Sequence, residues 1–504
     1  MIGSFARRAT LTASAVVALT AAALPGDTTS AGLGDRLYPE LGNPGYDVHD
    51  YDIAFTYRGN DRPLDAVTRV DALATDALSR FHLDFRGDVR SVEVDGRPAA
   101  FTTWHEELVV TPAVPVRRGD RLRVTVVHTS DPVAKGDTGW IRTKDGLAMA
   151  NQAAAAHTVF PCNDHPSDKA RFSFHVTAPN DLTVVANGLP ETAVRKGPVT
   201  TWNYRTVHPM ATELAQVSIG RSAVLRRTGP RGLPLRDVIG SADPDRATLE
   251  KRLAMTAGQI AWMERQVGPF PLETYGVLSA DTVTGFELET QTLSLFERRV
   301  LLAREADAVP VMVHELAHQW FGDSVSPATW SDLWLNEGHA TWYQWRYAAE
   351  HYREVTLEQL AEAAYGADAR LRRDGGPAAA PKPPGADGKL GIFRGNVYYG
   401  GALALYALRQ EMGAEAFQRL ERTWVARHRD AVASTRDFIA LASEVAGRDL
   451  GGFLRAWLYG PTTPPMPGHP DWKRSVPAKP VPAKPVPAKP VHGTTHRREA
   501  GKVA

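Results

Sequence analysis

Two histidines and a glutamate near the middle of the chain have the types and spacing of a metal site. His314 and His318 lie four residues apart in the sequence His-Glu-Leu-Ala-His, among apolar residues that are compatible with a helix. On a helix, side chains four residues apart lie one turn above each other on the same face. Two such imidazoles can each direct a nitrogen at one Zn²⁺ from about 2.0–2.1 Å. Glu315 would flank the ion, where it can accept a proton from bound water.

A catalytic zinc ion needs a third protein ligand and one open coordination position. Glu337, in Asn-Glu-Gly, follows His318 after eighteen residues. Glycine and proline residues between them should end the first helix, and a second amphipathic run begins near Trp334. This helix–turn–helix spacing can return Glu337 to the metal. The sequence therefore predicts one Zn²⁺ per chain, held by His314, His318 and Glu337.

The elements that position these residues belong to a chain of ordinary globular composition. Its 504 residues predict more than one domain, and 43% hydrophobic and 23% charged residues are typical of folded proteins. A net charge of +1 gives no reason to expect a nucleic acid or an anionic membrane as a partner. Cys162 is the single cysteine, so it cannot form an internal disulfide bond.

Residues 1–31 have the pattern of a signal peptide. A basic pair, Arg7 and Arg8, precedes an apolar run over residues 10–24 and a stretch of small residues. The run is too short and too rich in alanine to favour a permanent transmembrane helix. We therefore expect a secreted, extracellular protein with no stable membrane partner. The adjacent arginines allow a twin-arginine route, and an uncleaved membrane anchor is the alternative interpretation.

Residues 40–228 predict an all-β domain that resembles a sandwich. Short, largely alternating runs rich in Val, Phe, Tyr and Thr are separated by turn residues such as Asp-Gly. The expected strands are residues 51–57, 80–85, 91–94, 107–111, 121–128, 171–177 and 201–206.

Residues 229–472 predict a mixed domain. One helix is expected over residues 245–266 because apolar residues recur three or four apart, and strands are expected at 275–278 and 288–293. After the zinc motif, the pattern is helical at residues 356–372, 401–412, 415–427 and 436–445. This order predicts an α+β catalytic domain with a mostly helical C-terminal half.

Residues 473–504 form a tail of different composition. Val-Pro-Ala-Lys-Pro occurs three times in tandem from residue 476 to residue 490, a pattern typical of extended polyproline II. The repeated lysines predict either a solvated tail or a weak contact with an anionic cell wall.

The zinc motif and its flanks resemble the aminopeptidase N family of zinc metallopeptidases, the gluzincin aminopeptidases that include leukotriene hydrolase. The segment Phe160–Ala170, which reads FPCNDHPSDKA, is similar to a signature of the same family. The resemblance implies a saddle-shaped N-terminal β domain, a thermolysin-like catalytic domain and peptide substrates. We expect a compact form without the helical C-terminal domain of the larger family members.

The resemblance also implies a residue that binds the substrate's amino group. Residues 285–291 resemble the family's Gly-x-Met-Glu-Asn motif, which lies on an edge strand and whose glutamate contacts the free α-amino group. Glu289 is the matching glutamate. Phe286, Glu287 and Thr290 replace the family's glycine, alanine and asparagine, and Glu287 is expected to be an ordinary exposed strand carboxylate.

Two further site residues are implied by the resemblance. Residues 397–401 resemble the family's Val-Tyr-x-basic-Gly, in which Tyr398 would donate a hydrogen bond to the oxyanion of a tetrahedral intermediate. Gly400 stands where the basic residue would be, and Tyr399 is expected to pack in the core, although a shift of one place between the two tyrosines remains open. Gln152 falls where the family places a residue that lines the first substrate pocket.

The resemblance implies a secreted zinc aminopeptidase in which Glu315 is the general base. A thermolysin-like endopeptidase would need the zinc ligands but not Glu289, and an epoxide hydrolase like the family's bifunctional member is a second alternative. A protein that only binds peptides is a third, which the presence of Glu315 and all three ligands disfavours. The zinc motif alone does not separate the three enzymes.

Overall fold

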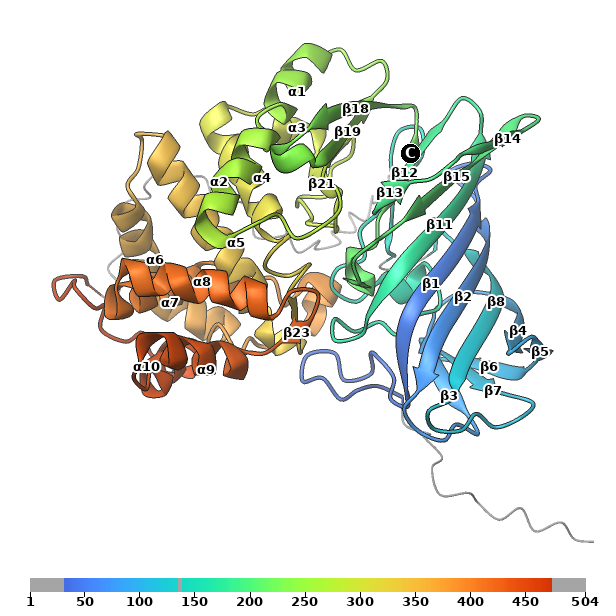
Figure 1. Ribbon diagram of the computed structural model, residues 1–504, viewed down its shortest axis with the longest axis horizontal. Coiled ribbons are helices and arrows are strands. Elements are labelled where there is room, and N and C mark those ends of the chain that lie inside the picture. The colour runs from blue at the N-terminus through green and yellow to red at the C-terminus, as the bar shows by residue number, and fades with distance from the viewer. Residues whose placement is uncertain (1–30, 135–137, 474–504) are drawn as a thin grey trace, which may run out of the picture.

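The computed structural model describes residues 31–134 and 138–473. A β-rich N-terminal domain lies beside a domain that holds the ten α-helices of the described residues (Figure 1). This arrangement confirms the predicted fold class, an all-β domain followed by an α+β domain with a mostly helical C-terminal half. The predicted signal peptide and tail lie almost entirely outside the described residues. Within the described part, no helix has the length and apolar character needed to cross a membrane.

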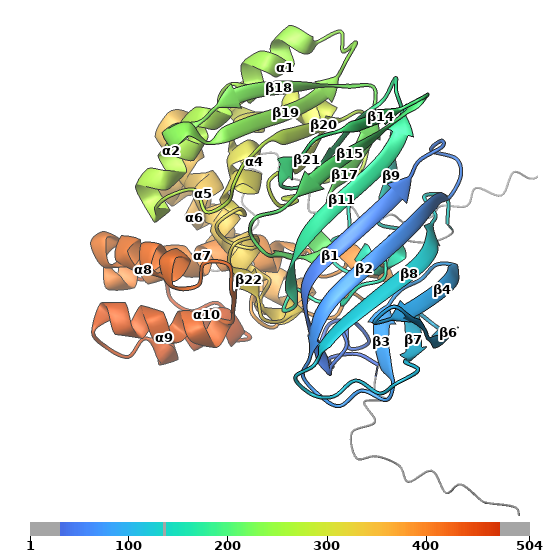
Figure 2. The ribbon, with the colours of Figure 1, turned by 45° about the vertical axis from the view of Figure 1, so that its right-hand side comes forward.

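The largest sheet forms the body of the N-terminal domain. Its ten strands are β1 (Tyr46–Thr56), β2 (Leu64–Ala74), β4 (Val89–Val94), β5 (Arg97–Pro98), β8 (Arg121–Ser130), β11 (Lys169–Pro179), β13 (Leu189–Pro190), β14 (Val194–Lys196), β15 (Val199–Arg205) and β16 (Met210–Ala211). Their order is β13-β15-β11-β1-β2-β8-β4-β5, with β14 paired to β15 and β16 paired to β11. Figure 2 shows the long strands side by side, with α8–α10 on the opposite side of the molecule.

Alternation of buried and exposed side chains holds this sheet in register. On β8, Leu122, Val124 and Val126 are buried, whereas Arg121 and Arg123 between them are exposed. Because strand residues alternate between the two faces, one face can join the apolar core while the other carries charge. β2 is absent from the predicted strands because alanine, aspartate and arginine interrupt its β-branched residues.

Two smaller sheets complete the N-terminal domain. One contains β9 (Trp140–Arg142), β10 (Leu147–Met149), β12 (Thr183–Ala186) and β17 (Val217–Gly220), and the other contains β3 (Phe81–Asp84), β6 (Ala100–Trp104) and β7 (Glu107–Thr111). Short 3₁₀ turns lie at η1 (Ala156–Thr158) and η2 (Thr212–Leu214).

The second domain opens with a four-stranded sheet of β18 (Ser222–Thr228), β19 (Pro234–Gly240), β20 (Val277–Ala280) and β21 (Ser294–Glu297). The boundary predicted at residues 228–229 therefore falls between two strands that pair with each other. Two further strands, β22 (Ser326–Pro327) and β23 (Val432–Ala433), pair in parallel. The 3₁₀ turns here are η3 (Pro230–Gly232), η4 (Trp330–Asp332) and η5 (Gly385–Leu390).

The helices pack around one apolar core, separate from the core of the N-terminal domain. They are α1 (Arg246–Leu253), α2 (Thr256–Val267), α3 (Arg298–Leu301), α4 (Glu305–Ala317), α5 (Trp334–His351), α6 (Leu357–Gly375), α7 (Gly395–Met412), α8 (Ala414–Arg427), α9 (Thr435–Ala446) and α10 (Gly451–Tyr459). The helix predicted over residues 245–266 is divided into α1 and α2, and α10 was not predicted.

Two sequence predictions near the site are wrong in their local structure. The strand expected at residues 288–293 is instead a reversal: Thr292 has a positive φ of 66°, and Leu288 pairs back onto Leu295 in an isolated bridge. α7 begins at Gly395, six residues before its predicted start, so Tyr398 lies on the helix and not ahead of it. Glycines at 395, 400 and 401 had weakened the helical pattern in the sequence.

Candidate active site

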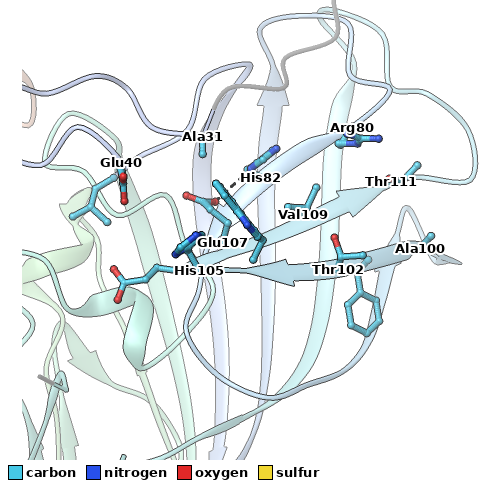
Figure 3. Close-up of a pocket in the computed structure, with 14 residues that line it drawn as sticks. Ala31, Glu40, Arg80, His82, Ala100, Thr102, His105, Glu107, Val109 and Thr111 are labelled. Carbon is cyan, nitrogen blue, oxygen red and sulfur yellow. Dashed lines mark ion pairs between the residues drawn. The ribbon is translucent and has the colours of Figure 1, made fainter. Parts of the chain in front are cut away.

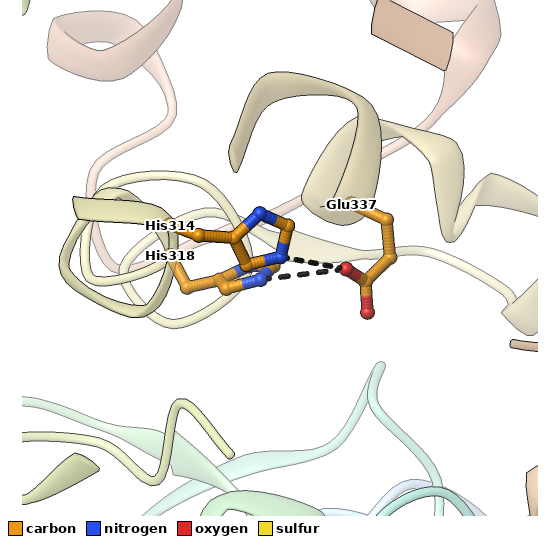
Figure 4. Close-up of side chains that lie close together, drawn as sticks. All are labelled: His314, His318 and Glu337. Atoms are coloured by element: carbon orange, nitrogen blue, oxygen red, sulfur yellow. Dashed lines mark hydrogen bonds and ion pairs between the residues drawn. The ribbon is translucent and has the colours of Figure 1, made fainter. Parts of the chain in front are cut away.

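The three predicted metal ligands meet between α4 and α5. His314 lies on α4, His318 directly follows that helix in a helical conformation, and Glu337 lies in the first turn of α5. Figure 4 shows both imidazoles directed at the Glu337 carboxylate. His314 Nε2 and His318 Nε2 are 3.2 and 3.5 Å from Glu337 Oε2.

The spacing of these donors fits a zinc ion. A tetrahedral ion with bonds of about 2.0–2.2 Å separates its ligand atoms by about 3.3–3.6 Å. The distances of 3.2 and 3.5 Å lie close to that range, and one ligand atom from each residue lies within 4.8 Å of the others. All three side chains are buried, so bulk water competes little for them. Two nitrogens and a carboxylate oxygen are a donor set that Zn²⁺ favours.

Hydrogen bonds orient both imidazoles. His314 Nδ1 is 3.0 Å from Gln344 Oε1, and His318 Nδ1 is 3.1 Å from the Phe321 carbonyl oxygen. Each acceptor holds the ring proton on Nδ1 and leaves the Nε2 lone pair free for a metal. Sequence reasoning missed Gln344. Its position seven residues after Glu337, two turns along one face of α5, was the available signal.

The charges around the ligands differ between the two histidines. Burial lowers the pKa of His314, which favours the neutral ring that a metal requires. Burial also opposes a charge on His318, but the carboxylates of Glu289 and Glu337 outweigh it and raise the pKa of His318 to about 10. Where no metal is bound, His318 therefore carries the positive charge that faces the carboxylates of Glu289 and Glu337.

Glu315 and Glu289 also lie close to His318. One ligand atom from each of Glu289, Glu315 and His318 lies within 4.8 Å of the others, and all three residues are buried. Burial, followed by repulsion from Glu289, raises the pKa of Glu315 well above its usual value. Once ionised, a carboxylate with a raised pKa accepts a proton more readily than an ordinary one, which is what a general base requires.

Contacts from both domains hold Glu289. Gln152 of the N-terminal domain donates from Nε2 to Glu289 Oε1 at 2.5 Å, although the two residues are 137 positions apart. Gln319, next to His318, donates from Nε2 to the Glu289 carbonyl at 3.1 Å and accepts from the Thr292 amide at 2.8 Å. Gln319 thereby connects the reversal at residues 290–293 to the C-terminal end of α4.

The neighbouring Glu287 corrects one prediction. It was expected to be exposed, but it is only 7% exposed. Burial, then repulsion from Glu297, raises the pKa of Glu287 to about 7. The reversal after Thr290 folds this segment against β21, which removes the solvent-exposed edge that an open strand would have had.

The two adjacent tyrosines in the first turns of α7, Tyr398 and Tyr399, have different surroundings. The Tyr398 ring stacks near that of His314, with centroids 6.0 Å apart and planes at 21°. Tyr399 stacks on Trp345 at 6.3 Å and packs against the core of the helical domain. Burial, then the charge of Glu337, raises the pKa of Tyr398 well above its usual value, so its phenol keeps the proton that it would donate.

A separate cavity of about 680 Å³ lies on the N-terminal domain (Figure 3). It covers the outer face of β3, β7 and β6, where His82 Nδ1 is 3.7 Å from Glu107 Oε2. None of the seven predicted site residues lines it. The predicted site residues therefore lie apart from this cavity.

Comparison with known proteins gives matches in both domains. Residues 252–457 match the profile of the peptidase family M1 domain, and residues 144–214 match that of the peptidase M1 N-terminal domain. The chain is 26% identical to aminopeptidase M1-D of Oryza sativa subsp. japonica over 332 residues, which are 62% of this chain and 37% of that protein. It is 28% identical to aminopeptidase N of Rattus norvegicus over 217 residues, 41% of this chain and 22% of that protein. The chain thus spans less than two-fifths of the length of these curated relatives.

Solved structures resemble a larger share of the chain. The M1 zinc metallopeptidase of Deinococcus radiodurans superposes with a TM-score of 0.76 at 29% identity, over 86% of this chain and 98% of that one. A mutant of that metallopeptidase bound to a Tyr-Ser-Ala substrate superposes with the same TM-score of 0.76 at 28% identity, over 86% of this chain and 99% of the other.

Proposed function

Because this chain belongs to the aminopeptidase N family of zinc metallopeptidases, peptidase family M1, we propose that it hydrolyses the N-terminal peptide bond of peptides. The catalytic residues would be Glu315 and Tyr398, and the metal ligands would be His314, His318 and Glu337. We propose one zinc ion per chain, since the described residues bring together one such set of two histidines and a glutamate.

One observation carries the choice of an aminopeptidase. Glu289 lies beside Glu315 and His318, and its carboxylate is held by the amide of Gln152. A buried carboxylate at this position can bind an ammonium group through a charge-assisted hydrogen bond. A peptide whose N-terminal ammonium binds there would present its first peptide bond to the metal ligands. An endopeptidase has no need of such a carboxylate.

The protein's own residues divide the chemistry between them. A zinc ion bound by the three ligands would polarise the scissile carbonyl and lower the pKa of a coordinated water toward about 7. Glu315 would accept the proton of the attacking water and pass it to the leaving amine. Tyr398, next to His314, would donate a hydrogen bond to the developing oxyanion. Glu289 and Gln152 would hold the substrate's first residue in place.

Peptides are the proposed partners, and the sequence of residues 1–31 supports export from the cell. The net charge of +1 supports the absence of a nucleic-acid partner or a stable membrane partner. We also propose a weak cell-wall contact through the lysines of the tail, with a solvated tail as the alternative. Deleting residues 476–504 should then weaken binding to isolated cell walls without changing turnover of small substrates, and unchanged wall binding would count against that contact.

The decisive experiment compares aminoacyl-amide reporters with their N-acetylated forms and with N-blocked peptides that contain internal bonds. We expect hydrolysis of the free aminoacyl compounds and little of the acetylated ones, because acetylation removes the ammonium charge. Rapid cleavage of internal bonds in blocked peptides would favour the endopeptidase. Turnover of an epoxide in place of peptides would favour the hydrolase, and binding without any turnover would favour a peptide-binding protein.

A further inference from the structure

The chain segment ahead of the first strand crosses from one domain to the other. Residues 35–38, here called the strap, contain Asp35, whose carboxylate bonds to both sides. Its Oδ1 accepts from the Leu37 amide at 2.7 Å, and its Oδ2 accepts from the Trp330 amide at 2.9 Å. Asp35 Oδ2 also lies 3.4 Å from Nε2 of His165, in the N-terminal domain.

Arg36, the next residue, links the strap to the loop that precedes α7. Arg36 donates to Ser331 Oγ at 3.2 Å and to the Pro381 carbonyl at 2.7 Å. From the other side, Arg394 at the start of α7 donates to the Pro383 and Pro384 carbonyls at 3.4 and 3.2 Å. The proline-rich loop before α7 is therefore held by one arginine from the strap and by another directly ahead of α7.

Leu37 and Tyr38 complete a third, small apolar cluster between the two main cores. Leu37 is 3% exposed, and the Tyr38 ring meets that of Trp330 edge-on with centroids 5.9 Å apart. The other members are Ala153, Leu333, Ile392, Phe393 and Val397, with Leu390 and Tyr398 packed against them.

Three members of the cluster are chain neighbours of site residues or of a helix that carries one. Ala153 follows Gln152, Val397 precedes Tyr398, and Leu333 immediately precedes α5, which carries Glu337. Tyr398 itself packs on the cluster. A shift of these apolar side chains would therefore be transmitted to the phenol and, across the domain boundary, to Gln152.

We infer that the strap is a positioning element for the proposed reaction: Leu37 and Tyr38 hold the first turn of α7 so that the Tyr398 phenol lies over the metal ligands. This inference rests on the proposed function. Truncating a buried leucine leaves a cavity into which neighbours relax only partly. Displacements on the order of 1 Å near a reacting group can cost up to about a hundredfold in rate.

The test is a double-mutant cycle measured as kcat on a free aminoacyl reporter. Leu37→Ala should lower kcat about tenfold with native Tyr398, with KM nearly unchanged. In a Tyr398→Phe background the same substitution should lower kcat less than twofold, because the hydroxyl that it misplaces is already gone. Leu33→Ala is the matched control: Leu33 lies two residues ahead of the strap, is 42% exposed and is outside the cluster.

A structural role alone would give equal losses in both backgrounds, and that result would overturn the inference. If Leu37→Ala does not fold, Leu37→Val makes a smaller cavity and should show the same dependence on Tyr398 with a smaller loss. Leu37→Met conserves the side-chain volume, so this variant should keep a kcat close to that of the native protein. No hydrolysis by the unmodified, zinc-loaded protein would overturn the proposed function together with the inference. Hydrolysis with background-independent losses would overturn the inference alone.

Discussion

Gly338 and Gly401 bring helices α5 and α7 into backbone contact. A Cβ atom built on Gly401 would lie 2.8 Å from the Gly338 Cα, and one built on Gly338 would lie 2.9 Å from the Gly401 Cα. Glu337 directly precedes the first glycine, and Tyr398 lies one turn before the second. The close approach therefore sets the separation between a metal ligand and the proposed oxyanion donor.

This contact predicts that Gly401→Ala separates the two helices. We expect a loss of about 1–3 kcal/mol in the free energy of unfolding, as for an overpacked core, and a clear fall in kcat. Denaturant unfolding and turnover of an aminoacyl reporter measure the two effects. Gly366→Ala on α6 is the control, because a Cβ there meets no atom within 4 Å, and it should stabilise the helix slightly. Equal behaviour of both variants would contradict the packing argument.

Glu315→Gln should separate metal binding from chemistry. Glutamine keeps the size of the side chain but cannot accept the proton, so kcat should fall about a hundredfold or more. Zinc content should stay near that of the native protein, because Glu315 is not among the three proposed ligands. Metal analysis and kinetics on one preparation give both values. A variant that turns over within a few-fold of the native rate would exclude Glu315 as the base.

Glu289→Ala should remove the preference for a free N-terminus. Loss of one partner from a buried charge pair costs about 2–5 kcal/mol, or roughly 30-fold to several thousand-fold in kcat/KM on free aminoacyl substrates. The ratio between free and acetylated substrates should shrink accordingly. Glu287→Gln, two residues away, should keep that ratio. If Glu289→Ala leaves the ratio between free and acetylated substrates unchanged, Glu289 is not the residue that binds the substrate's ammonium group.

Gln344→Leu should weaken zinc binding without removing a ligand. The amide oxygen lies 3.0 Å from His314 Nδ1, and loss of such an outer partner costs about 10–100-fold in metal affinity. Competition with a chromophoric chelator measures the change in the dissociation constant. Gln344→Glu retains an acceptor and should bind zinc at least as tightly as the native protein. An unchanged affinity in Gln344→Leu would mean that the hydrogen bond does not orient His314.

Zinc affinity should increase with pH. In the metal-free protein, burial lowers the pKa of His318, but the carboxylates of Glu289 and Glu337 raise it by more, to about 10. The His318 ring therefore carries a proton at neutral pH. Since zinc needs the neutral ring, binding must displace that proton. The affinity should rise about tenfold per pH unit below pH 10, and calorimetry in buffers of different ionisation enthalpy should detect close to one proton released. Affinity that does not vary between pH 6 and pH 9 would contradict the raised pKa.

The sequence by itself determined the parts of the site that are local in the chain. His314, Glu315 and His318 are placed by a single turn of helix, and Glu337 returns through a short helix–turn–helix connection, so spacing alone was sufficient. The identity of Glu289 and Tyr398 as candidates came from motif similarity, but their surroundings did not. The reversal at Thr292 and the early start of α7 depend on tertiary packing, which the helix and strand propensities of single residues do not contain.

Only the tertiary structure decided the contacts between distant segments. Gln152 meets Glu289 across 137 positions, and Asp35 meets Trp330 across 295. Gln344 faces His314 only because α4 and α5 pack with those faces together. The reason is physical: a hydrogen bond between distant residues depends on how whole sheets and helices bury their apolar faces. That burial is a property of the folded chain, and no short stretch of sequence contains it.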